Sequence, residues 1–164
     1  MAASSWSRKL DYVYLAFFVI HIPVMLVVDL AGFYPTSVRP TFTLAIRDYY
    51  IDTYRDRFFI DPPLWFKGFM LLELVYHLPL SLWAIPAILR DDPLVPLQLL
   101  VFALETAVST LTCTLEMLSW KGYSLEEQSR LCALYVPYLV LAIVMGGDMF
   151  VRLRTTLLTK SKMQ

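Results

Sequence analysis

The sequence lacks an excess of charge of either sign. Its 14 lysine and arginine residues balance 14 aspartate and glutamate residues, so the formal net charge is zero. Without a basic excess the chain has no general attraction for nucleic acid, and without an acidic tail it has none for cationic proteins. We therefore expect no nucleic acid partner.

Cysteine is nearly absent as well, since Cys113 and Cys132 are the only two in 164 residues. Their spacing matches no metal motif and the sequence indicates no cofactor, so we expect neither a metal nor a cofactor. Both lie near what we interpret as the lumenal ends of two membrane helices, where an oxidising compartment permits a disulfide. Two buried thiols are the default interpretation.

Apolar residues are abundant: the chain is 58% hydrophobic and only 17% charged, with a mean hydropathy of +0.58. These values lie outside the ordinary soluble range and predict a small integral membrane protein. A helix needs roughly 20 residues to cross about 30 Å of hydrocarbon. Four apolar runs meet this length, at residues 11–33, 66–89, 94–117 and 131–151.

Four prolines interrupt these runs, namely Pro23, Pro79, Pro86 and Pro137. Each removes a backbone donor, which a membrane bundle tolerates as a kink. We therefore predict an all-α membrane protein, a four-transmembrane-helix bundle with kinked helices, in a single domain over residues 1–164.

Basic residues predict the orientation, because short cytoplasmic segments are rich in them. Arg8 and Lys9 precede the first run, which has no small-residue cleavage site and is interpreted as a retained helix. A basic tail at 152–164 holds Arg152, Arg154, Lys160 and Lys162. Both termini are therefore expected in the cytosol. The last five residues also resemble a dilysine signal that returns proteins to the endoplasmic reticulum membrane, the alternative being an ordinary solvated tail.

The first loop, residues 34–65, is too long for a turn and too aromatic for a disordered linker. Its aromatic side chains alternate with charged ones. This pattern favours a short interfacial helix in the first lumenal loop, lying at the membrane surface or capping the bundle. Asp56 would then point toward the mouth of the bundle.

Charged and titratable residues inside the runs are the candidate site. Translocon measurements put the cost of an ionised group at a helix centre at about 2.5–3.5 kcal/mol, so such groups usually face the interior and carry a function. Among them we single out Asp29, Glu73, His77, Glu105 and Glu116. We assign Glu116, at a helix edge, to interfacial structure.

Spacing groups these residues on helix faces. In the third run Gln98, Glu105, Ser109, Thr112 and Glu116 follow a 7, 4, 3, 4 spacing, which predicts one inward polar stripe. Glu73 and His77 are four residues apart and share a face. Further lining residues would be His21, Met25, Tyr135 and Tyr138. The alternative is a bundle joined by interhelical hydrogen bonds of only about 0.6 kcal/mol each.

Several motifs carry a family resemblance. They are His21-Ile22-Pro23, Asp29, Asp56, Pro62-Pro63-x-Trp65-Phe66-Lys67-x-Phe69, Glu73-Leu74-Val75, Leu78-Pro79 and Tyr135-x-Pro137-Tyr138. Together they resemble the sigma-two receptor branch of the EXPERA superfamily, which also contains the emopamil-binding sterol isomerase. The resemblance covers essentially the whole chain.

This resemblance implies a protein of the endoplasmic reticulum membrane that binds sterols or cationic amphiphiles in a cavity between its helices. Asp29 would pair with a ligand ammonium group, Glu73 would support it and Asp56 would order the site. Tyr50, Trp65, Tyr135 and Tyr138 would supply aromatic walls. Homodimers occur in the superfamily, although no small-residue stripe here specifies an interface.

Two departures from the receptor pattern keep an enzyme open as the alternative. The receptor pattern has glutamine at position 77 and histidine at position 105. Glu105-Thr106 instead resembles the sterol isomerase, as does the pair of Glu73 and His77, although in reversed order. A cofactor-independent sterol or terpenoid isomerase or cyclase protonates an alkene, stabilises a carbocation and removes another proton. Glu73, His77 and Glu105 would then be the catalytic residues.

Overall fold

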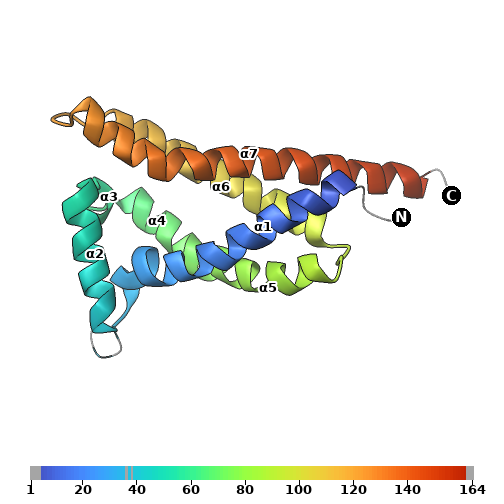
Figure 1. Ribbon diagram of the computed structural model, residues 1–164, viewed down its shortest axis with the longest axis horizontal. Coiled ribbons are helices and arrows are strands. Elements are labelled where there is room, and N and C mark those ends of the chain that lie inside the picture. The colour runs from blue at the N-terminus through green and yellow to red at the C-terminus, as the bar shows by residue number, and fades with distance from the viewer. Residues whose placement is uncertain (1–4, 36, 38, 162–164) are drawn as a thin grey trace. The chain divides into compact units, whose positions relative to one another are not determined.

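The computed structural model describes residues 5–35, 37 and 39–161, and within these ranges its regular structure is entirely helical (Figure 1). Four helices are long and apolar enough to cross a membrane: Arg8–Gly32, Leu64–Leu89, Val95–Leu118 and Leu125–Thr159. Each overlaps one of the four apolar runs in the sequence. The prediction of an all-α, four-span membrane protein is therefore confirmed.

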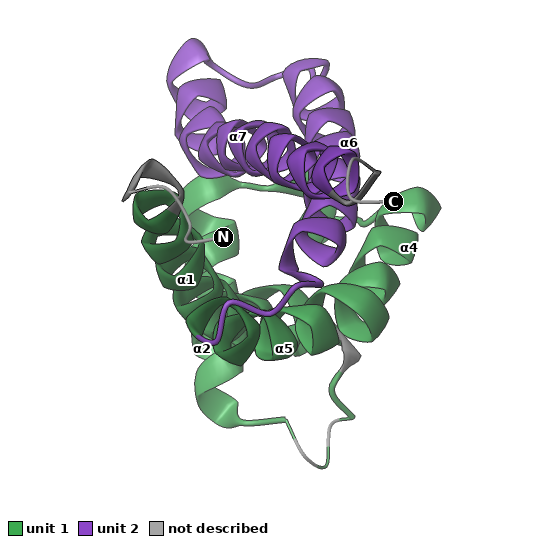
Figure 2. Ribbon diagram, turned by 90° about the vertical axis from the view of Figure 1, so that its right-hand side faces the viewer, with its two compact units in different colours: residues 1–89 green, residues 90–164 purple. Residues whose placement is uncertain are grey.

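The chain forms two compact units, residues 1–89 and 90–164 (Figure 2). The first unit holds the first two spans and the long loop between them, and the second holds the third and fourth spans. The single domain expected over residues 1–164 stays a prediction.

The first span changes its helical form before it ends. Helix α1 (Ser5–Val24) leads into a π-helical turn, η1 (Met25–Asp29), in which the Leu30 amide donates to the Met25 carbonyl. A 3-10 turn, η2 (Leu30–Phe33), follows. The helix is therefore wider than an α-helix over the turn that ends at Asp29 and narrower over the turn that follows.

The second span contains a similar irregularity. Helix α4 (Leu64–Leu72) is followed by a π turn, η3 (Glu73–His77), and then by α5 (Leu78–Leu89). Pro79 comes directly after this turn and has no N–H to donate to the carbonyl four residues earlier, so the regular ladder cannot continue through it. The irregularity expected at Pro79 thus takes the form of a π turn.

The first loop folds into two helices, α2 (Thr41–Tyr54) and α3 (Arg57–Ile60). In Figure 1 the axis of α2 runs across that of α1. Helix α2 ends where Arg55 adopts a left-handed conformation with φ of 52°. The Arg47 guanidinium then donates to the Phe59 carbonyl at 2.9 Å, which ties α2 to α3. The helix expected in this loop is present.

The second unit is a pair of packed helices, α6 (Val95–Leu118) and α7 (Leu125–Ser161). They approach closely at Gly146, where an added Cβ would lie 3.6 Å from the Ala103 Cβ. Cys113 and Cys132 are both free thiols, as in the default interpretation, although Cys113 is buried and Cys132 only half-buried.

Helix α7 is longer than the predicted fourth span. Its 37 residues measure about 55 Å at about 1.5 Å per residue, against about 30 Å of hydrocarbon. Much of the predicted basic tail therefore continues the helix, through Ser161. Residues 162–164, which are three of the five residues of the dilysine-like motif, lie outside the described residues.

Candidate functional site

The titratable groups of the first two spans lie at the two π turns. Asp29 is the last residue of η1, and Glu73 and His77 are the first and last residues of η3. Such turns interrupt the i to i+4 ladder of an α-helix and occur frequently at functional sites. A π turn therefore joins Glu73 and His77 where a regular α-helical turn was expected, and the shared face of the two side chains stays a prediction. His77 is buried and Glu73 only partly so.

A second histidine lies beside His77. The ring centroids of His21 and His77 are 6.4 Å apart, and both side chains are buried. The Phe17 ring stacks on the His21 ring, and their centroids are 4.8 Å apart. Helices α1 and α5 pack against each other, which brings the first two spans together around this histidine pair. Sequence reasoning placed both histidines among the lining residues but did not foresee their contact.

The structure brings Asp29 and Asp56 together although 27 positions separate them in the sequence. Helix α2 packs on η1, and the Asp29 carboxyl group interacts electrostatically with that of Asp56. Met25, one turn before Asp29, is fully buried. The two carboxyl groups are therefore close enough to influence each other electrostatically, where the first span ends.

Asp56 itself is fully buried and has defined partners on both oxygens. The Phe58 amide donates to its Oδ1 at 3.0 Å, which makes Asp56 the N-cap of α3. The Tyr50 hydroxyl donates to its Oδ2 at 2.8 Å. Hydrogen bonds to a carboxylate are among the stronger ones in proteins. Asp56 consequently connects α2, which carries Tyr50, to the start of α3.

Aromatic side chains fill the base of the loop. Phe58 stacks on Phe66 with centroids 4.7 Å apart, and the Tyr50 ring meets Phe59 at 5.1 Å. Trp65 contacts Phe58 edge to face at 5.4 Å and is 36% exposed. Trp65 therefore belongs to the packing between α3 and α4.

The polar stripe expected on the third span is only partly inward. Thr112 and Glu116 are exposed, whereas Glu105 and Ser109 are half-buried. The Thr112 hydroxyl donates to the Val108 carbonyl of its own helix at 2.8 Å, so it needs no interior partner. The buried face of α6 consists mainly of other residues: Val95, Leu99, Phe102, Ala103, Thr106, Cys113, Thr114 and Met117. The inward position predicted for Thr112 was wrong, and the exposure of Glu116 agrees with its assignment to interfacial structure.

Tyr135 and Tyr138 are half-buried on α7. With Glu105 they belong to the second unit, and Asp29, Asp56, Glu73 and His77 belong to the first. A cavity lined by all four spans stays a prediction.

Sequence reasoning missed an ion pair inside the fourth span. Arg152 and Asp148 meet at 2.7 Å, with side chains 19% and 16% exposed. Their four-residue spacing on one helix was the signal that could have revealed them. We had assigned Arg152 to the basic tail.

Ser81 was also missed. Its side chain is fully buried on α5, and its hydroxyl has no hydrogen-bond partner within the described part of the chain. It follows His77 by four residues, a spacing that could have indicated it.

Comparisons with known proteins agree with the helical architecture. Residues 42–149 match the EXPERA family, described as the expanded EBP superfamily. Sigma intracellular receptor 2 of Homo sapiens is 25% identical over 158 residues, covering 88% of this chain and 89% of the receptor. The Xenopus tropicalis receptor of the same name is 24% identical over 148 residues, covering 85% and 86%. Efficient mitochondria targeting-associated protein 19 of Schizosaccharomyces pombe is 25% identical over 146 residues, covering 88% and 76%.

Proposed function

Because the chain belongs to the EXPERA superfamily, we propose that it binds sterols or cationic amphiphilic molecules inside the membrane, as a receptor-like protein. The observation that carries this proposal is the packing of α2 on η1, which places the buried Asp56 carboxyl group within electrostatic range of Asp29 at the end of the first span. Paired acids in a membrane protein mark a site for a cation or a proton, because isolated charges there are costly. A ligand with an ammonium group on an apolar body fits such a site, because its charge pairs with the carboxylate and its apolar part is soluble in the bilayer.

The residues around the pair suit an amphiphile. Glu73 lies on the π turn of the neighbouring span and would support the ammonium group, while Asp56, already bound by Tyr50, would keep the pair in place. His21, Met25, Trp65, Tyr135 and Tyr138 would contact the apolar body, the aromatic ones also by cation–π attraction. The similarity to proteins named sigma intracellular receptor 2 supports a receptor that takes small ligands.

The cellular setting is part of the same proposal. The dilysine-like motif supports a place in the endoplasmic reticulum membrane, and the basic residues before the first span and after the fourth support cytosolic termini. A homodimer is compatible with this topology. The ligand reaches the acids from the bilayer, which dissolves its apolar part.

Equilibrium binding to the purified full-length protein tests the proposal. A tertiary-amine amphiphile and a neutral isostere, in which carbon replaces nitrogen, are titrated separately into protein held in nanodiscs. We expect saturable binding of the amine, displaced by sterol, with an affinity at least about tenfold above that of the isostere, because about 1.4 kcal/mol of charge attraction suffices for that ratio. Equal affinities would show that the acids form no cation site.

An isomerase or cyclase acting on sterols or terpenoids is the second candidate, and the π turn bearing Glu73 and the buried His77 favours it. These residues would protonate an alkene carbon, and Glu105 would take a proton from another carbon. Candidate substrates are incubated with the protein in deuterated water, and deuterium at carbon is then measured. Incorporation that is lost in Glu105→Gln and kept in Glu116→Gln, an exposed residue on the same helix, would establish catalysis. No incorporation with any candidate would leave binding as the function.

A further inference from the structure

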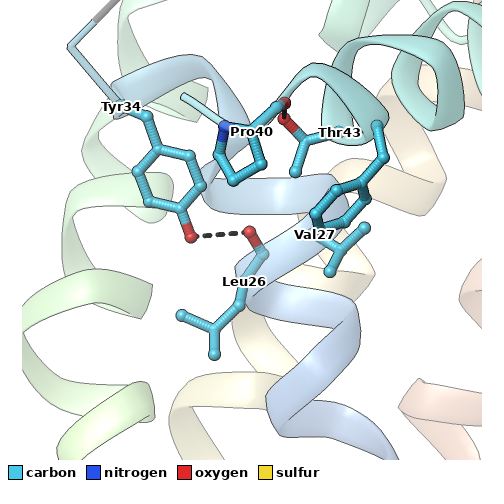
Figure 3. Close-up of a pocket in the computed structure, with 6 residues that line it drawn as sticks. Leu26, Val27, Tyr34, Pro40 and Thr43 are labelled. Atoms are coloured by element: carbon cyan, nitrogen blue, oxygen red, sulfur yellow. Dashed lines mark hydrogen bonds between the residues drawn. The ribbon is translucent and has the colours of Figure 1, made fainter. Parts of the chain in front are cut away.

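A pocket lies at the end of the first span, beneath the start of α2 (Figure 3). Its volume is about 310 Å³. Its lining combines two residues of η1 with four from the loop and α2: Leu26, Val27, Tyr34, Pro40, Phe42 and Thr43. Neither Asp29 nor Asp56 lines it, so it is separate from the carboxyl pair.

The pocket offers apolar surface and few polar contacts. The Tyr34 hydroxyl donates to the Leu26 carbonyl at 2.6 Å, and the Thr43 hydroxyl donates to the Pro40 carbonyl at 2.7 Å, as the dashed lines in Figure 3 show. Each hydroxyl has a single proton, and both protons are used within the protein. A ligand in this pocket must therefore bind mainly through apolar contacts of its hydrocarbon part.

A cationic side chain is bound to one residue of the pocket lining. Arg39 precedes Pro40 of the lining, and its Nη2 donates to the Tyr34 carbonyl at 2.8 Å. Its Nε is buried and has no hydrogen-bond partner within the described part of the chain. Backbone carbonyls hold the guanidinium group in place without neutralising it. A phosphate group near the guanidinium group would supply the opposite charge.

The apolar pocket and the guanidinium group follow each other along the first span in the same order as the acyl chains and the headgroup of a lipid in one leaflet. Leu26 and Val27 lie within the membrane-spanning helix Arg8–Gly32, whereas Arg39 reaches toward the Gly32 carbonyl at the end of that helix. The pocket floor is therefore at hydrocarbon depth, and the guanidinium group is at the level of the lipid headgroups. On α2 the apolar surface continues through Phe42, 56% exposed, and Ile46, 39% exposed.

We propose that this pocket holds one acyl chain of a phospholipid from the leaflet at this end of the first span, with Arg39 bound to the lipid phosphate. The lipid would connect η1 to α2 and so support the loop that carries Tyr50 and Asp56.

Photo-crosslinking tests the proposal. The full-length protein is reconstituted in phosphatidylcholine vesicles containing a small fraction of phosphatidylcholine with a diazirine in one acyl chain. After irradiation the modified peptides are quantified by mass spectrometry. We expect adducts to concentrate between Leu26 and Thr43. In Val27→Trp, which fills the pocket, they should fall severalfold, whereas Val19→Trp on the exposed face of α1 should leave them unchanged.

The headgroup contact is tested in the same vesicles. Arg39→Gln should reduce adducts in this segment severalfold, and Arg130→Gln, an exposed arginine at the start of α7, should not. Adducts spread evenly over the exposed faces of α1 would show bulk lipid only and would overturn the proposal. A diazirine sterol that labels the segment where the phospholipid does not would overturn the phospholipid assignment. Hydrogen exchange of α1 and α2 confirms that each variant is folded.

Discussion

Asp29→Asn is expected to lower the affinity for a cationic amphiphile by at least about a hundredfold. Opposite unit charges about 4 Å apart attract by about 4 kcal/mol at an effective dielectric constant of about 20, and about 1.4 kcal/mol is a factor of ten in affinity. Asparagine keeps the size of the side chain and removes this attraction. Equilibrium binding of the amine to the purified variant measures the loss.

Two observations make the Asp29→Asn result specific. The neutral isostere of the amine should bind wild type and variant equally, because it has no charge to interact with the Asp29 carboxylate. The variant should also remain folded, because asparagine relieves the interaction between two like carboxyl groups at Asp29 and Asp56. Asp52→Asn, an exposed aspartate on α2, serves as the matched control. Undiminished amine affinity in Asp29→Asn would remove Asp29 from the ligand site.

Asp56→Ala is expected to destabilise the first loop by about 2–4 kcal/mol. Loss of an N-cap costs about 1 kcal/mol, and a buried donor left without a partner costs about 1–3 kcal/mol. Both apply here, because the Phe58 amide and the Tyr50 hydroxyl each donate to the Asp56 carboxylate. Hydrogen exchange of the amides in residues 50–60 should accelerate accordingly, since local opening sets their protection.

Smaller changes at the same place separate the contributions. Tyr50→Phe removes one hydrogen bond and should cost only about 1 kcal/mol, while Asp61→Ala, an exposed aspartate at the end of α3, should leave the exchange of residues 50–60 unaltered. The double variant of Asp56 and Tyr50 should be less destabilised than the sum of the singles, because both remove the same bond. Unchanged protection in Asp56→Ala would show that aromatic packing alone holds the loop.

The four spans were predictable because each depends on a local property. A run of apolar residues of sufficient length must become a helix in a bilayer, where an unpaired backbone group costs several kcal/mol. The helix in the first loop was predictable for a related reason, since its aromatic and charged residues alternate. The end of the fourth span was not, because Arg152 was taken as the start of a tail when it pairs with Asp148 on the same helix.

The positions of the polar residues were harder to predict, because a polar side chain can find its hydrogen-bond partners in several ways. Periodicity assigned Thr112 to the bundle interior, yet its hydroxyl bonds the preceding turn of its own helix and the side chain is exposed. Periodicity also assumed a regular helix through Glu73 and His77. A π turn there changes the angular offset of every residue that follows, so small irregularities in the backbone decide which side chains meet.

By itself, the sequence determined a four-span membrane protein of the EXPERA superfamily with acids in its spans, because hydropathy, length and motif are properties of consecutive residues. Only the tertiary structure decided that Asp29 lies within electrostatic range of Asp56, that the His21 ring lies beside that of His77 and that Arg39 binds Tyr34 of the pocket lining. The members of the first two pairs are 27 and 56 positions apart in the chain. Their contacts depend on how α2 folds back onto η1 and how α1 packs on α5. No local preference encodes such an arrangement, because it results from the burial of whole helix faces together.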